Sequence, residues 1–404
     1  MSGSASLLLV THVHVRQGPR GWQVDDQTAA GIAQWCRHFD AVTFVGIGID
    51  DAGDAFSSSV WADLEGVHPG LRVIALPYGY SVGATWRHWR GVRAVLAREI
   101  GAHRHLCFTL GNVVGDWPAL GAWEAVRQGR RFAAWIDRVE PFVIRTRFAG
   151  APVKRLLAEA TMPFTQGVLR YLLRRSAVAL LQGGDTFDWY AGAAGDPHCT
   201  YDTHTRADDA IAADVLAAKR ARVLAGGPLR IVYTGRAHGM KGPWDWLDVV
   251  QGLVARGVPV VARWLGDGPL LDEMRAAVAA RGLDGVVALP GYADKAGVMA
   301  ALAEADLLMF CHKTPESARC LIEALVRGCP IVGYDGGYPR GLVAAEGGGA
   351  FVPLGDVAGL VATVAGLHAD RAGLAGLIGA AAASGQRYDE DTVYAHRAGL
   401  MKLG

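Results

Sequence analysis

Two carboxylates in the second half of the chain, Glu316 and Glu323, have a spacing that could bind the hydroxyl groups of a ligand. They are seven positions apart, and two helical turns place such residues on roughly the same side of a helix. Pro315-Glu316-Ser317 is predicted to open this helix, whose N-terminus offers N–H groups and partial positive charge to an anion. This combination suits a ligand with hydroxyls and phosphates, such as a nucleotide sugar. The alternative is a solvent-exposed helix face.

The apolar pattern around the two carboxylates predicts a strand, a helix and a second strand. Residues 307–310 end an apolar strand, and residues 331–333 form a short buried one. Between them, apolar residues at helical spacing give the helix one buried face; these are Leu321, Ile322, Leu325 and Val326. Gly328 stands where a helix usually ends. The carboxylates therefore lie on an element that follows the carboxyl end of a strand.

The same alternation of strands and helices runs through the whole chain. In the second half, a strand at 229–234 leads into Gly235-Arg236 and Lys241-Gly242, and a strand at 258–265 ends in the run 266–269, GDGP. In the first half, apolar strands are expected at 7–10 and 41–46. Alternation of this kind predicts an α/β fold with parallel, doubly wound sheets, whose ligands bind at the carboxyl ends of the strands.

The first strand is expected to lead into a loop over residues 12–21. A helix is then predicted to begin near Asp25 or Asp26, either of which could cap it. The glycine-rich and proline-rich texture from Tyr190 to Gly227 predicts a connection between two domains. No strand is followed by a GxGxxG phosphate-binding turn, which disfavours a nicotinamide-dependent dehydrogenase.

These motifs, in their order and spacing over about residues 229–366, resemble the retaining GT-B glycosyltransferases of family 4, the glycosyl transferases group 1. The resemblance implies two Rossmann-like domains that face a central cleft. Residues 1–190 would bind the acceptor, residues 191–228 would connect the domains, and residues 229–385 would bind the donor. A terminal helix within 386–404 would cross back onto the first domain.

The resemblance also implies roles for particular residues. Arg236 and Lys241 match the family's diphosphate-binding pair, and Glu323 matches the carboxylate that accepts hydrogen bonds from the ribose hydroxyls. Glu316 would meet the donor sugar. The residues that would complete the donor site are Gly235, Ser317, Ala318, Arg319, Gly18 and Gly21. The candidates on the acceptor side are Arg20, Asp137 and Glu140.

Two positions depart from the family pattern. Six residues separate Glu316 from Glu323 where the family has seven, and Ile136 stands where the family often has a histidine before Asp137. These departures favour one alternative, a non-catalytic GT-B module that only binds a partner. Another alternative is a nucleotide-sugar epimerase or hydrolase, which would use the same donor residues without an acceptor.

The reaction that the resemblance implies is sugar transfer from a nucleotide-diphosphate donor to a hydroxyl acceptor, with the anomeric configuration retained. The acceptor could be a glycan, a lipid-linked molecule or a small molecule. Two cations and a helix N-terminus can stabilise the departing diphosphate, so we expect no metal ion and no cofactor. The nucleotide, the sugar, the linkage and the oligomeric state stay open.

Composition narrows the possible partners. The formal net charge of +1 provides no field that would attract nucleic acid, and no apolar run approaches the length of a membrane-spanning helix. The six cysteines form no CxxC pair and are expected to be free thiols of a cytosolic protein. Residues 145–176 interleave arginines and lysines with leucines. Such a stretch could contact an anionic membrane or a lipid phosphate, or it could be a helix with a solvated charged side.

Overall fold

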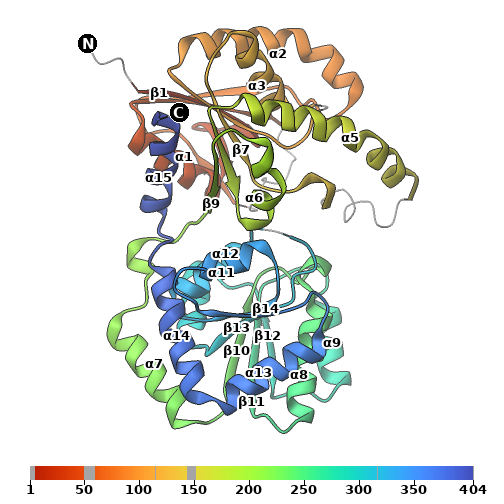
Figure 1. The fold of residues 1–404 in the computed structure, drawn as a ribbon, viewed down its shortest axis with the longest axis vertical. Coiled ribbons are helices and arrows are strands. Elements are labelled where there is room, and N and C mark those ends of the chain that lie inside the picture. Colours follow the sequence, from red (N-terminus) through yellow and green to blue (C-terminus); the bar gives the residue numbers. More distant parts are fainter. Residues whose placement is uncertain (1–4, 50–59, 114, 143–151, 316, 404) are drawn as a thin grey trace. The chain divides into compact units, whose positions relative to one another are not determined.

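The computed structural model describes residues 5–49, 60–113, 115–142, 152–315 and 317–403, and side chains are not described at 152–155 and 157. The chain divides into two compact units (Figure 1). Unit 1 comprises Met1–His204 and Glu390–Gly404, and unit 2 comprises Thr205–Asp389. In each unit, helices cover both faces of a sheet. The predicted α/β fold with two Rossmann-like domains is confirmed.

The described strands of unit 1 form one nine-stranded sheet. They are β1 (Ser6–Gly18), β2 (Gly21–Asp25), β3 (Ala41–Gly48), β4 (Trp61–Asp63), β5 (Leu71–Leu76), β6 (His105–Thr109), β7 (Ala133–Ile136), β8 (Val178–Gln182) and β9 (Pro197–Thr200). The parallel part has the order β5-β3-β1-β6-β7-β8-β9. Strand order therefore reverses direction between β1 and β6, which is a topological switch point.

Helices pack on both faces of this sheet because β1 is buried on both sides. Leu7 and Leu9 lie in one apolar cluster with Trp35 and Tyr394, whereas Leu8 and Val10 lie in the other with Leu96. The helices of unit 1 are α1 (Asp26–His38), α2 (Val82–Ala102), α3 (Trp117–Arg127), α5 (Pro152–Arg175), α6 (Gly184–Tyr190) and α15 (Glu390–Leu403). The last of these, α15, packs against α1.

Unit 2 contains a six-stranded parallel sheet with the order β12-β11-β10-β13-β14-β15. Its strands are β10 (Leu229–Thr234), β11 (Val260–Leu265), β12 (Val287–Gly291), β13 (Leu307–Phe310), β14 (Ile331–Tyr334) and β15 (Gly349–Val352). The switch point lies between β10 and β13. The described helices are α7 (Ala213–Ala225), α8 (Pro243–Ala255), α9 (Leu271–Ala280), α10 (Lys295–Glu304), α11 (Arg319–Val326), α12 (Gly337–Val343), α13 (Val357–Ala369) and α14 (Arg371–Gly385).

Local capping explains where several helices begin. The Asp25 carboxylate accepts a hydrogen bond from the Thr28 backbone N–H at 3.0 Å, which confirms the predicted cap of α1. Ser81 caps α2 in the same way, through the Ala84 N–H at 3.2 Å. The six cysteines all lie among the described residues, and each is a free thiol as predicted. Within the described ranges, no helix is both long and apolar enough to cross a membrane.

Two expectations about local structure are wrong. Residues 12–21 do not form a loop: β1 continues to Gly18 and pairs antiparallel with β2 in a hairpin. The alternation HVHV at residues 12–15 explains this, because polar and apolar residues alternate with the period of a strand. The helix expected to open at residues 315–317 begins at Arg319. A hydrogen bond from the Lys313 N–H to the Met240 carbonyl, at 2.8 Å, ties the chain after β13 to the loop after β10.

Candidate functional site

The carboxyl ends of β10 and β13 carry the best-defined candidate site in unit 2. They flank the switch point of the sheet, where doubly wound folds bind their ligands. Gly235 to Lys241 follow β10, and Cys311 to Lys313 follow β13. The structure therefore brings the predicted Arg236 and Lys241 to the edge where a ligand is expected.

Glycines allow the loops at this edge to approach each other closely. Gly266 has a φ of +149°, and a Cβ there would lie 2.0 Å from the Gly235 carbonyl oxygen. That carbonyl also accepts a hydrogen bond from the Trp264 indole at 3.0 Å. Gly235 itself has a φ of +149°. The loops after β10 and β11 are consequently fixed to each other by backbone contacts that residues with a Cβ would block.

The loop after β10 is also fixed to the end of β13. A 3₁₀ turn, Gly239–Lys241, is followed by Gly242 in the left-handed region, at a φ of +63°. A Cβ on Gly242 would lie 2.1 Å from the Cys311 carbonyl oxygen. The backbone position of Lys241 thus depends on β13 as well as on β10.

A buried histidine lies beside Lys241. The imidazole Nε2 of His312 is 2.8 Å from the Tyr233 hydroxyl, and both side chains are buried. Burial lowers the pKa of His312 well below its usual value, and the charge of Lys241 lowers it further. His312 is therefore neutral at physiological pH. It contributes hydrogen-bonding capacity without a second positive charge.

Asp245, at the start of α8, binds two side chains that come from the ends of neighbouring strands. Its carboxylate forms an ion pair with Lys313 after β13 and accepts a hydrogen bond from the Tyr334 hydroxyl of β14. The Lys313 ammonium lies 5.3 Å from the centre of the Tyr334 ring. Burial and then this hydrogen bond raise the pKa of Tyr334. These contacts join α8 to both strands and support the loop that carries Lys241.

The predicted carboxylate Glu323 lies on the second turn of α11 and is half-buried. Burial raises its pKa, the charges of Arg319 and Lys295 oppose that rise, and Asp209 adds to it. Lys295, at the start of α10, also forms an ion pair with Asp209 at 2.8 Å. Ser317 and Ala318 precede α11, and Arg319 begins it. Glu316 lies outside the described residues. Arg236 is exposed.

Unit 1 carries polar side chains at its own switch point. His12 lies beyond the last pair of β1 with β6, at Val10, and within the irregularity of β1 between its pairs with β3 at Val10 and His14. Its Nδ1 is 3.5 Å from the Thr109 hydroxyl at the end of β6. Burial lowers the pKa of His12, and the carboxylate of Asp137, which follows β7, raises it. The Oδ1 atom of Asp137 is buried and accepts no hydrogen bond from the described residues. The structure therefore joins the predicted Asp137 to His12.

The residues that follow Asp137 form an ion pair. The Arg138 guanidinium donates to the Glu140 carboxylate at 3.1 Å, and Glu140 is buried. Burial lowers the pKa of Arg138, but Asp137, Glu140 and Asp116 raise it more strongly, so the net shift is upward. Arg138 lies between the predicted Asp137 and Glu140 in the sequence, and its positive charge attracts both carboxylates.

The structure does not bring the remaining predicted residues of unit 1 to this switch point. Gly18 and Gly21 face each other as the last pair of the β1–β2 hairpin, and Arg20 lies in its turn. The Arg20 guanidinium forms an ion pair with Asp63 of β4. These three residues therefore have a structural role in the hairpin.

Sequence analysis missed His12, His312 and Asp245 as candidate site residues. Asp245 lies in the first turn of α8, and His312 lies two residues beyond the end of β13. His12 lies two residues beyond the apolar run at 7–10, although β1 continues past it. That position was a usable signal for the two histidines, because the carboxyl ends of parallel strands meet at one edge of a sheet. No local signal identified the partners Tyr233 and Lys313, which depend on strand order.

Comparisons with known proteins agree with this geometry. Residues 228–370 match the family described as Glycosyl transferases group 1. The matched residues lie within unit 2. This match confirms the predicted resemblance to glycosyl transferases group 1. Among curated relatives, 140 residues of this chain are 33% identical to 2-deoxystreptamine N-acetyl-D-glucosaminyltransferase of Streptomyces fradiae. That match covers 34% of this chain and 33%, about a third, of the relative's length.

Solved structures show a likeness in fold that covers both units of this chain. HepE (Alr3699) of Anabaena, in complex with UDP, has a TM-score of 0.67 at 16% identity, with 99% of this chain and all of that chain (100%) covered. Sucrose-phosphate synthase of Thermosynechococcus elongatus has a TM-score of 0.64 at 16% identity, with 98% of each chain covered. At such low identity these matches show the fold, which is GT-B. The expectation of a GT-B fold is confirmed.

Proposed function

We propose that this protein is a metal-independent, retaining glycosyltransferase that transfers a sugar from a nucleotide-diphosphate donor to a hydroxyl acceptor. The observation that carries the proposal is the placement of Arg236 and Lys241 in the loop after β10, at the switch point of a group 1 domain. A diphosphate leaving group gains negative charge as the glycosidic bond breaks. Cations placed where that charge develops lower the barrier.

The two cations suit different parts of this task. Lys241 is half-buried, and its positive charge acts on the neutral His312 beyond the end of β13. Arg236 is exposed and offers a planar fork that can bind two oxygens of a phosphate. Because these cations supply positive charge themselves, the proposal needs no metal ion.

The donor's sugar and ribose groups would meet α11. Glu323 would accept hydrogen bonds from the ribose hydroxyls. Glu316 and the backbone of Ser317, Ala318 and Arg319 would contact the transferred sugar. Glu323 is half-buried, and hydroxyl donors would replace the water that its carboxylate loses, which favours this role. HepE was solved with UDP, so UDP is the first nucleotide to test.

The acceptor would bind at the carboxyl edge of unit 1. Asp137 has a buried oxygen without a hydrogen bond from the described residues, and it lies near His12. An acceptor hydroxyl would donate to that oxygen and so satisfy it. Glu140 would hold Arg138 in place rather than contact the acceptor directly.

The first test is thermal shift of the full chain with UDP, GDP, ADP, CMP and dTDP, each with and without EDTA. We expect one diphosphate to raise the melting temperature to the same extent in EDTA. The shift should disappear in Lys241→Ala and persist in Arg256→Ala, because Arg256 ends α8 at the opposite end from Lys241. A shift that EDTA abolishes would overturn metal independence, and no shift with any diphosphate would favour a non-catalytic module.

A second test distinguishes transfer from the related reactions. The UDP-sugar that supports turnover is incubated with and without an acceptor, and the products are analysed by NMR. Transfer with retention predicts a product whose anomeric configuration matches the donor. Free sugar or an epimerised donor without acceptor would show a hydrolase or an epimerase instead.

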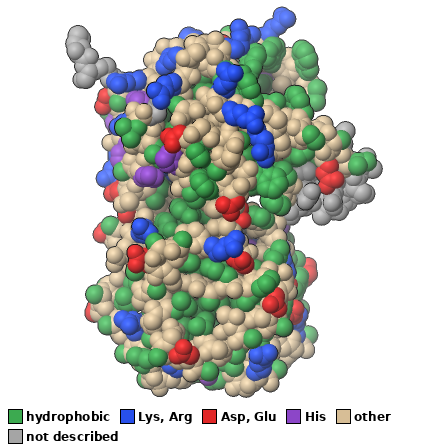
Figure 2. Space-filling model, in the orientation of Figure 1, with side chains coloured by type: hydrophobic (Ala, Val, Ile, Leu, Met, Phe, Trp, Pro, Cys, Tyr) green, Lys and Arg blue, Asp and Glu red, His purple; other side chains and the backbone are tan. Residues whose placement is uncertain are grey.

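An anionic membrane is a candidate partner of unit 1. On α5, Leu156 is 70% exposed and Phe164 is 68% exposed, and the Arg175 guanidinium lies 5.3 Å from the Tyr171 ring. Figure 2 shows hydrophobic and basic side chains interleaved on the visible face of unit 1. Apolar and basic side chains on one helix favour peripheral binding to anionic lipid. Arg145 and Arg147 of the predicted basic stretch lie outside the described residues.

Co-sedimentation with vesicles tests this contact. Vesicles with phosphatidylglycerol should bind the protein, whereas vesicles of phosphatidylcholine alone should not. Phe164→Ser should weaken binding. The matched control Leu354→Ser, at a position 60% exposed in unit 2, should leave it unchanged. Equal binding by both variants would remove α5 as the contact.

A further inference from the structure

A cavity in unit 1 lies at the edge of the sheet opposite to His12 and Asp137. Its volume is about 310 Å³, near the lower end of ligand pockets, which span roughly 300–1,000 Å³. The first residues of three strands line it: His105 of β6, Ala133 of β7 and Val178 of β8. The last turn of α15 lines its other side, through Met401 to Leu403. The cavity is therefore separate from the residues assigned to the acceptor.

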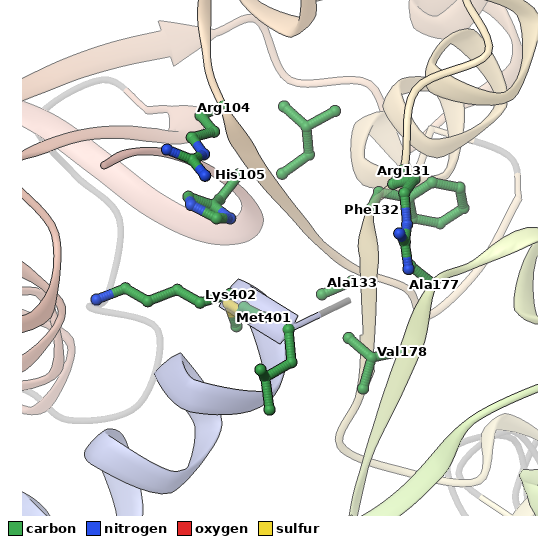
Figure 3. A pocket seen from close by; sticks show the side chains of 11 residues that line it. Arg104, His105, Arg131, Phe132, Ala133, Ala177, Val178, Met401 and Lys402 are labelled. Carbon is green, nitrogen blue, oxygen red and sulfur yellow. The ribbon is translucent and has the colours of Figure 1, made fainter. Parts of the chain in front are cut away.

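The charged residues described at this cavity are all positive. Three cations line it, Arg104, Arg131 and Lys402, and no Asp or Glu occurs among the described residues that line it. The chain as a whole has a formal net charge of only +1, so this is a local concentration of positive charge. In Figure 3, Arg104 and His105 lie on one side of the cavity, Arg131 lies on the other, and Met401 and Lys402 of α15 lie below.

Two of these cations differ in how they are held. The Lys402 ammonium donates to the His38 carbonyl and lies 4.9 Å from the Phe39 ring, so its charge has a fixed place at the rim. The Arg131 guanidinium is exposed, and no hydrogen bond or ion pair to it occurs among the residues described. An arginine with its fork available can bind two oxygens of a carboxylate or phosphate at once.

The rest of the lining is apolar, and Phe132, Val178 and Met401 represent it. Apolar walls lower the local dielectric and strengthen the attraction between the cations and an anion. They also favour a ligand with a small apolar part. We propose that this cavity is a second ligand site, which binds a small molecule with an oxyanion, a carboxylate or a phosphate, attached to a short apolar group.

Such a ligand would hold α15 against the sheet. The chain leaves unit 2 at Asp389 and returns to unit 1 as α15, which contacts β6 and β8. Further along this helix, the Arg397 guanidinium lies 4.6 Å from the Trp135 ring, whereas Leu403 is 86% exposed. The last turn is thus the part of α15 that a ligand in the cavity would order.

His105 provides a reporter inside the cavity. Burial lowers its pKa, a hydrogen bond with the Met401 backbone opposes this, and the charges of Arg104 and Lys402 lower it further. A bound anion would offset those charges, so the pKa of His105 should rise on binding. Its imidazole proton signals in NMR therefore report occupancy at this place rather than elsewhere in the chain.

The experiment titrates the full chain with phenyl phosphate, inorganic phosphate and phenol. It follows the His105 signals and the hydrogen exchange of residues 398–403. Phenyl phosphate should raise the pKa of His105 and slow exchange in the last turn of α15. Inorganic phosphate and phenol should each bind at least tenfold more weakly, because inorganic phosphate lacks the apolar group and phenol lacks the phosphate.

Variants locate the binding. Arg131→Gln should weaken the phenyl phosphate effect on His105 at least tenfold, whereas Arg90→Gln, an exposed arginine on α2 of the same unit, should leave it unchanged. Equal binding by wild type and Arg131→Gln would overturn the proposal, as would protection confined to unit 2. The test measures binding at unit 1 without turnover, so its outcome is independent of the proposed transferase activity.

Discussion

Gly242 lies so close to Cys311 that a Cβ on the glycine would approach the Cys311 carbonyl oxygen to 2.1 Å. This contact joins the loop after β10 to the chain after β13, across the switch point of unit 2. Gly242 also has a φ of +63°, which residues with a Cβ adopt at a cost. The position of Lys241 therefore depends on a glycine whose replacement faces two separate penalties.

The first prediction is that Gly242→Ala destabilises unit 2 and weakens diphosphate binding. The left-handed backbone alone costs about 1–2 kcal/mol, and the backbone clash adds to that. Gly239→Ala is the matched control, because nothing lies within 4 Å of a Cβ at Gly239 in the same loop. Urea denaturation and UDP titration measure both effects. Equal behaviour of the two variants would show that the contact is dispensable.

Lys241→Ala should lower kcat about 10²–10³-fold, which corresponds to losing about 3–4 kcal/mol of stabilisation where charge develops. Arg236→Ala should lower kcat/KM for the donor as well. Steady-state kinetics with saturating acceptor measures both. Arg256→Ala should remain at wild-type values. Unchanged turnover in Lys241→Ala and Arg236→Ala together would remove the diphosphate role.

Glu323→Ala should raise the donor KM by about 10–100-fold with little change in kcat. Hydrogen bonds to a charged group contribute about 1.5–3 kcal/mol, and the ribose contacts are the same in the ground state and the transition state. The control is Glu304→Ala, whose carboxylate is 60% exposed and pairs only with Arg263 among its described contacts. A donor KM at the wild-type value would place the ribose elsewhere.

Asp137→Asn should lower kcat/KM for the acceptor while leaving the donor KM unchanged, because Asp137 lies in unit 1 and its buried oxygen would receive the acceptor hydroxyl. We expect a loss of about tenfold or more, the effect of weakening one charge-assisted hydrogen bond. Glu65→Gln, an exposed carboxylate of the same unit, controls for the change in charge. A donor-side defect in Asp137→Asn would contradict the assignment.

Asp116 predicts how the stability of unit 1 depends on pH. Burial raises its pKa to about 6, although the backbone N–H groups of Asn112, Ala119 and Gly111 oppose the shift, and so does the charge of Arg138. The folded state therefore holds the proton more tightly than the unfolded state, whose pKa is about 3.9. This contribution to stability is complete below the unfolded value and is lost as pH rises through about 6.

Urea denaturation of wild type and Asp116→Asn between pH 4 and pH 7 tests this. The wild type should lose up to about 3 kcal/mol relative to the variant as pH rises across that window, since each pKa unit corresponds to about 1.4 kcal/mol. The difference in free energy of unfolding between the wild type and the variant removes the contributions of other titrating groups. A constant difference would mean that the three backbone N–H groups keep Asp116 ionised throughout.

The sequence alone determined the elements and the class of fold. Apolar runs such as residues 229–234 and 71–76 coincide with β10 and β5. Asp25 caps α1, and Ser81 caps α2. These features are local, because the spacing of apolar residues within a strand or helix indicates which of its sides is buried. Arg236, Lys241 and Glu323 were predicted as site residues from the family resemblance, and their roles stay predictions.

Only the tertiary structure decided which residues meet. Tyr233 meets His312, and Lys313 pairs with Asp245 of the helix after β10, because strand order places β10 beside β13. The charge of Asp137 reaches His12 because only β6 lies between β1 and β7. The same is true of Arg104, Arg131 and Lys402, which line one cavity from three separate parts of the chain. Strand order depends on how each crossover packs its helix on the sheet, and that packing is a property of the whole unit. The spacing of apolar residues in the sequence shows which side of a helix or strand is buried. It does not show which other element packs against that side.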